Sequence, residues 1–76
     1  METLRLRTEK QGRAGKTVTV IEGFTREKRL MERLASELKR SLATGGSFHE
    51  RTVCLQGDVR DRVRPLLLER GFKVKG

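Results

Sequence analysis

The sequence predicts an α+β two-layer sandwich, in which a five-stranded mixed sheet carries two helices on one face. Short segments alternate apolar and polar residues, and two longer segments repeat apolar residues at helical spacing. Their order, ββαββαβ, gives each strand one apolar face that a single layer of helices covers. The 76 residues form a single domain, 1–76, whose 34% hydrophobic content is low but periodic.

The first two strands form a predicted hairpin at the start of the chain. In residues 4–7, Leu4 and Leu6 are expected to face the core while Arg5 and Arg7 face outward. A β-branched run marks the second strand, at about residues 17–22.

A basic glycine-containing loop joins these strands. Gly12 and Gly15 allow backbone angles that other residues avoid, and Lys10, Arg13 and Lys16 supply positive charge beside them. The ending Gly-Lys-Thr is typical of a phosphate-binding P-loop, but that motif requires glycine at position 10 and a following helix. The loop is therefore interpreted as a mobile basic hairpin loop, and an ordinary turn with solvated charges is the alternative.

An amphipathic helix is predicted over residues 26–42, with Thr25 as its N-cap and Gly45 as its left-handed C-terminal residue. Its apolar residues follow the spacing of one helical face, which we expect to pack on the sheet: Leu30, Met31, Leu34, Ala35, Leu38 and Leu42.

A second hairpin is predicted over residues 48–56, turning around Glu50 and Arg51. The alternation in its second strand places Cys54 on the face opposite the core.

Asp58 is expected to cap the second helix, residues 59–70. Pro65 predicts a kink or an irregular first turn, Gly71 ends the helix, and residues 72–75 form the last strand. The helix is expected to bury Val59, Val63, Leu66 and Leu67.

The net charge of +8 favours a polyanionic partner, usually a polynucleotide. Residues 5–16 hold five basic residues and only one acid, Glu9, so the excess charge lies on the first hairpin. The open sheet face is predicted to be basic and hydroxyl-bearing, without an aromatic residue. It is expected to carry Arg5, Arg7, Thr52, Cys54, Gln56, Lys73 and Lys75.

The residue types argue against an enzyme or a metal protein. Cys54 and His49 are the only cysteine and histidine, and they stand near opposite ends of one hairpin. Asp58 and Asp61 are better explained by capping than by catalysis, because no third ligand or base accompanies them. We therefore expect no catalytic site, no metal and no cofactor. Because the sequence shows no signal peptide and no membrane span, we also expect a cytoplasmic monomer that binds no membrane.

Four segments of the chain resemble the eukaryotic-type translation initiation factor 1 (suppressor of initiator codon) family, including its short bacterial YciH-like members. They are GRAGKTVTVIEGF (12–24), LASELKRSLATGGS (34–47), LQGDVRD (55–61) and GFKVKG (71–76), in the family's order and spacing. The sequence departs from the family at Gln11, where a basic residue is common, and in a short second hairpin at residues 49–51.

The resemblance implies an α/β sandwich that binds the small ribosomal subunit near the decoding site and influences start-codon and initiator-tRNA selection. It also implies that the glycine-rich loop approaches ribosomal RNA, through Gly12, Arg13, Gly15 and Lys16. Lys10, Arg5, Arg7, Lys73 and Lys75 extend the expected RNA-binding set by their charge. The alternatives are a general RNA-binding module and a stress-related inhibitor of initiation.

Overall fold

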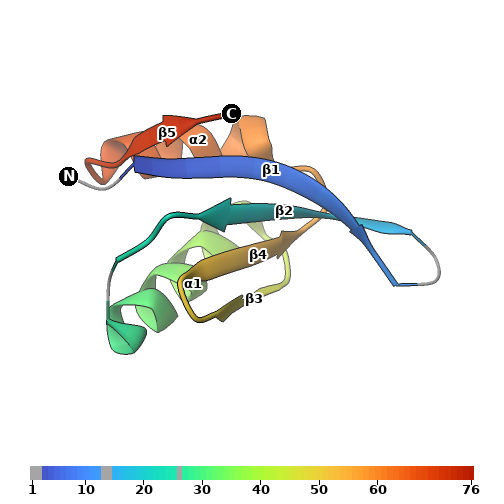
Figure 1. Ribbon diagram of the computed structural model, residues 1–76, viewed down its shortest axis with the longest axis horizontal. Coiled ribbons are helices and arrows are strands. Elements are labelled where there is room, and N and C mark those ends of the chain that lie inside the picture. Colours follow the sequence, from blue (N-terminus) through green and yellow to red (C-terminus); the bar gives the residue numbers. More distant parts are fainter. Residues whose placement is uncertain (1–2, 13–14, 26) are drawn as a thin grey trace.

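Seven elements follow one another in the predicted ββαββαβ order (Figure 1). The computed structural model describes residues 3–12, 15–25 and 27–76. The elements are β1 (Thr3–Gln11), β2 (Lys16–Glu22), α1 (Lys28–Leu42), β3 (Gly46–His49), β4 (Thr52–Gln56), α2 (Arg60–Glu69) and β5 (Lys73–Lys75).

The five strands form one sheet in the order β3-β4-β2-β1-β5. The β1–β5 pair is parallel and the other three pairs are antiparallel, so the sheet is mixed. Both helices lie on one face, behind the strands in Figure 1. The predicted α+β two-layer sandwich is thus confirmed.

The core lies between this sheet and the helices. Alternation along the strands turns Leu4, Leu6, Ile21, Val53 and Leu55 toward the helices, where all five are buried. The helices contribute Met31, Leu34, Ala35, Leu38 and Leu42 from α1 and Val63 and Leu67 from α2.

Two apolar residues of the predicted helix faces are less buried than expected. Leu30 is 40% exposed, because Met31 and Leu34 occupy the centre of the stripe that meets the sheet and Leu30 lies at its margin. Leu66 is only partly buried, although it packs against the core. Pro65 lies inside α2, which nevertheless continues to Glu69.

The ends of α1 differ from the prediction. The helix begins at Lys28 with Glu27 in the N-cap position and no side-chain cap, so the prediction of Thr25 as N-cap is wrong. At the other end Ala43, not Gly45, is left-handed, with φ 52°. The N–H groups of Ala43 and Thr44 donate to carbonyls in the last turn, which closes the helix before either glycine.

The start of α2 is held by a buried threonine of β2 rather than by Asp58. The Thr19 hydroxyl accepts a hydrogen bond from the Val59 N–H (2.9 Å) and donates one to the Gly57 carbonyl (2.7 Å). Val59 occupies the N-cap position without a side-chain cap, and Asp58 binds the Arg60 guanidinium at 3.0 Å with only a long contact, 3.4 Å, from the Arg60 N–H. The predicted capping role of Asp58 is therefore wrong, since a tertiary contact satisfies the helix start.

The β1–β2 hairpin is longer than its alternation predicted. Pairing continues to Gln11 opposite Lys16, so the loop contains only residues 12–15. Gly12 and Gly15 have φ of +76° and +61°, and the Gly15 N–H donates to the Gly12 carbonyl at 3.1 Å. The hairpin extends past the end of the remaining sheet in Figure 1.

Candidate nucleic-acid interface

The described part of the hairpin tip places two lysines around the glycine turn. Lys10 precedes Gln11 on the helix-side face of β1, whereas Lys16 opens β2 on the opposite face, and both are exposed. A Cβ on Gly15 would lie 3.9 Å from Lys10 Cδ, so the lysine stem runs beside the turn. Arg13, predicted for the same site, lies outside the described residues.

The two tip lysines are not neutralised by acids of the described ranges. Neither makes an ion pair with another residue of the described ranges, and Glu9, the acid on this hairpin arm, is bound by Arg7. Because unpaired cations beside glycines, which have no side chain, can approach phosphates closely, the tip has the chemistry of a polynucleotide contact.

Arg7 differs from the tip lysines because it is paired on both sides. Its guanidinium donates to Glu9 and to Glu22, the latter at 3.2 Å. These hydrogen bonds raise the pKa of Arg7, and the hydrogen bond between Arg7 and Glu9 lowers the pKa of the Glu9 carboxyl. Arg7 lies on the predicted open face, but its charge is already balanced there.

Three further predicted residues lie at the far end of the sheet. Lys75 pairs with Arg5 and Lys73 with Thr3, and all three basic side chains are exposed. Arg5 is six residues from Gln11 along β1, a separation of about 20 Å in an extended strand. The structure therefore divides the predicted site into a tip group and a distant β5 group.

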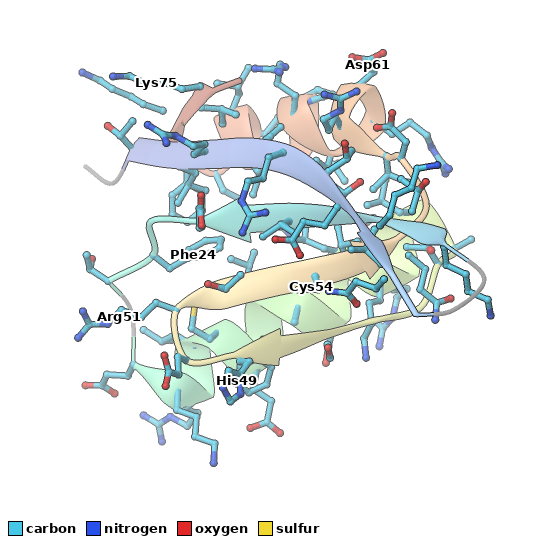
Figure 2. The ribbon with its side chains drawn as sticks, turned by 45° about the vertical axis from the view of Figure 1, so that its right-hand side comes forward. Phe24, His49, Arg51, Cys54, Asp61 and Lys75 are labelled. Carbon is cyan, nitrogen blue, oxygen red and sulfur yellow. The ribbon has the colours of Figure 1, made fainter. Side chains whose placement is uncertain are left out.

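The middle of the open face is apolar and covered, which the sequence analysis missed. Val18 and Val20 are 8% and 1% exposed although no helix covers them. Figure 2 shows the far end of β1 passing in front of β2 toward Cys54, and Gln11 and Cys54 line one hollow. The unbroken β-branched run from Val18 to Ile21 was the available signal, since such runs favour burial on both faces.

A hollow of about 820 Å³ lies at the opposite end of the sheet from the tip. It is bounded by the β3–β4 turn and the first residue of α1. The hollow is lined by Lys28, Phe48, His49, Glu50, Arg51 and Thr52. The sequence did not predict this combination of basic side chains with the half-buried ring of Phe48.

The histidine and the cysteine lie on the same open face but are not paired. His49 is opposite Thr52, and Cys54 is opposite Ser47. Burial, followed by the nearby Glu9 carboxylate, raises the pKa of the Cys54 thiol, which disfavours the thiolate. Within the described residues no three metal-ligating side chains form a group, and no helix is long and apolar enough to cross a membrane.

Residues 1–73 match the family model described as translation initiation factor SUI1. Proteins named protein translation factor SUI1 homolog are similar over nearly the whole chain. That of Sulfolobus acidocaldarius is 44% identical over 91% of this chain and 69% of its own length. Those of Hyperthermus butylicus and Pyrococcus furiosus are 44% and 42% identical over 93% of this chain, and 68% and 71% of their own lengths.

These relatives are archaeal, so they do not support the expected placement among the short bacterial members. They do support the wider resemblance and a role in translation initiation, because the family match runs from β1 to the first residue of β5 and the fold has the predicted topology. The chain belongs to the translation initiation factor SUI1 family.

Proposed function

We propose that this protein binds ribosomal RNA of the small ribosomal subunit near the decoding site and modulates start-codon or initiator-tRNA selection. It acts as a cytoplasmic monomer and catalyses no reaction. Membership in the SUI1 family supports the role in initiation, and initiator tRNA is the second partner in this proposal.

The observation that carries this proposal is the projecting hairpin tip. Lys10 and Lys16 flank a glycine turn, have no ion-pair partner in the described ranges, and stand clear of the helices. Arg13 adds a third charge to the same stretch of sequence. Phosphate contacts of this kind supply affinity that depends strongly on salt.

The remaining basic residues have subsidiary parts in this proposal. Arg5, Lys73 and Lys75 form a second exposed group that extends the RNA contact along the open edge of the sheet. Arg7 contributes less, because Glu9 and Glu22 already balance its charge.

A general single-strand RNA-binding module is a weaker alternative. Such modules stack bases on exposed aromatic rings. Phe24 and Phe72 are buried against each other, with ring centroids 5.6 Å apart, and the third phenylalanine, Phe48, is half-buried.

The test reverses the charges of the tip and compares the result with an equal change on α1. Lys10→Glu with Lys16→Glu should greatly weaken cosedimentation with the small subunit. Each lost phosphate contact should flatten the slope of log affinity against log salt by about 0.7 to 0.9. The control, Arg29→Glu with Arg33→Glu, changes the same charge on an exposed helix surface and should have much less effect.

Both double variants should retain the wild-type melting temperature, because isolated surface charges contribute little to stability. Arg13→Glu, added to the tip variant, should weaken binding further. Equal binding by the tip and helix variants would contradict the proposal and direct attention to Arg5, Lys73 and Lys75.

A further inference from the structure

The chain contains two glutamines and no asparagine, and both glutamines line one groove beside the hairpin. Two hollows, of about 590 and 280 Å³, share Gln11, Val18 and Gln56 in their linings. We call this shared depression the amide groove. The larger hollow adds Gly12, Lys16, Thr17 and Gly57, and the smaller adds Gly46, Ser47, Cys54 and Leu55.

Strand pairing and hairpin curvature form the groove together. Gln56 pairs with Val18 across β2 and β4, and both side chains point to the open face. Gln11, at the end of β1, reaches this group because the hairpin bends across the sheet toward Cys54 (Figure 2). Val18, almost fully buried, lines both hollows together with the two glutamines.

The polar groups of the groove are largely unused. The Gln56 side-chain amide lies against Gly45 but has no hydrogen-bond partner among the described residues, and the Gln11 amide nitrogen has only a long contact, 3.4 Å, to Glu9. Gly12 and Gly57 both have positive φ, and a Cβ on either would meet nothing within 4 Å, so the approach past them is open.

The charge of the lining selects the kind of ligand. Among the described residues of the lining, Lys16 is the one charged side chain, and the Glu9 carboxylate that contacts Gln11 is bound by Arg7. A ligand that fits therefore has an anionic part for the lysine, a flat apolar part for Val18 and a hydrogen-bonding edge for the amides. A nucleotide of single-stranded RNA has all three, and recognition of unpaired bases by their edges is the usual route to RNA specificity.

We propose that the amide groove holds one unpaired base of the bound RNA, with a preference for adenine. An amide can accept a hydrogen bond from the adenine amino group and donate one to the adjacent ring nitrogen, as glutamine does to adenine in DNA. Lys16 holds the phosphate of the same nucleotide. This assignment rests on the proposed function and adds base selectivity to a hairpin whose charge alone has none.

The test uses ¹⁵N-labelled full-length protein titrated with adenine-only and uracil-only oligoribonucleotides of equal length. Because the chain has only two side-chain amides, its NH₂ spectrum contains two pairs of signals, one for each glutamine. Both pairs should shift with the adenine oligonucleotide, which should bind about 5-fold or more tightly than the uracil one. Backbone signals of Lys10 and Lys16 should shift with both RNAs.

The variant Gln11→Met with Gln56→Met keeps the length of both side chains and removes both amides. It should lose the adenine preference and retain the affinity for the uracil oligonucleotide. The control, Thr52→Met, changes the other end of β4 on the same face and should retain the preference.

The inference is overturned if the adenine oligonucleotide leaves both NH₂ pairs unmoved, or if the Met variant keeps its preference for adenine. Small-subunit cosedimentation of the same Met variant separates the two proposals. If the Met variant retains salt-sensitive binding to the subunit, and the NH₂ signals of the wild-type protein do not move with RNA, the base site is removed and the proposed function stands. Wild-type protein that fails to bind the subunit would instead refute the proposed function.

Discussion

The two halves of the β1–β2 hairpin are continuous in the chain and have opposite environments. In the half near β5, Leu4, Leu6 and Ile21 are buried beneath the helices. In the half near the turn, Lys10, Gln11 and Lys16 lie beyond them and are exposed. On the helix-side face of the hairpin, helix cover thus decides which half stabilises the fold and which half is free to bind.

The boundary between the halves is at Thr19. This side chain faces the helices like Ile21, two residues further along β2, but it ends in a hydroxyl bonded to both Gly57 and Val59. The start of α2 is therefore tied to β2 at the point where helix cover ends. Substitutions along one face of β2 should have effects that fall steadily toward the tip.

The largest effect is expected at Ile21, which is fully buried. Ile21→Ala should lower the free energy of unfolding by about 2 to 5 kcal/mol, because it removes apolar contacts and leaves a cavity. The matched control is Thr17→Ala, on the same face of β2 in the uncovered half, and it should change stability by less than about 0.5 kcal/mol. Urea unfolding measures both, and equal losses would contradict the division into two halves.

An intermediate effect is expected at Thr19. Thr19→Val keeps the shape of the side chain but leaves the Val59 N–H and the Gly57 carbonyl without their partner, which should cost about 1 to 3 kcal/mol. Thr19→Ser retains the hydroxyl and should recover most of this loss. If the Val and Ser variants had the same melting temperature, the Thr19 hydroxyl would not be holding α2.

Sequence periodicity was sufficient to predict the layers of this fold. Alternation placed Leu4, Leu6, Val53 and Leu55 on the core face, and helical spacing identified the buried stripe of α1. Both signals are local, because strand and helix geometry determine which neighbours share a face.

Contacts between distant segments could not be predicted in the same way. Thr19 meets Val59 forty residues later in the chain, so no local pattern distinguishes it from other strand threonines. The Arg7–Glu22 ion pair likewise depends on the strand register, which places Glu22 opposite Arg5 and so diagonal to Arg7.

The candidate site was predictable only in its charged part. The tip lysines were found because glycines and unbalanced charge adjoin in sequence. The amide groove was not found, because Gln11 and Gln56 come together only when the hairpin bends over β4.

The smallest effect is expected at Asp58, which lies just outside α2 on the surface. Hydrogen bonds from the Arg60 side chain, and then from the Arg60 N–H, lower the pKa of this carboxyl. A carboxyl whose pKa is lower in the folded state than in the unfolded chain adds stability above its unfolded pKa, about 3.9, and loses it as the pH falls through the folded value. Asp58→Asn should therefore lower the melting temperature slightly at pH 7, by less than Thr19→Val, and the difference from wild type should shrink below about pH 4.

Arg60→Met removes the partner of Asp58 and should abolish this pH-dependent difference. If Asp58→Asn lowered the melting temperature as much as Thr19→Val, with no change down to pH 3, Asp58 would be the cap of α2 and the Thr19 hydroxyl would be secondary.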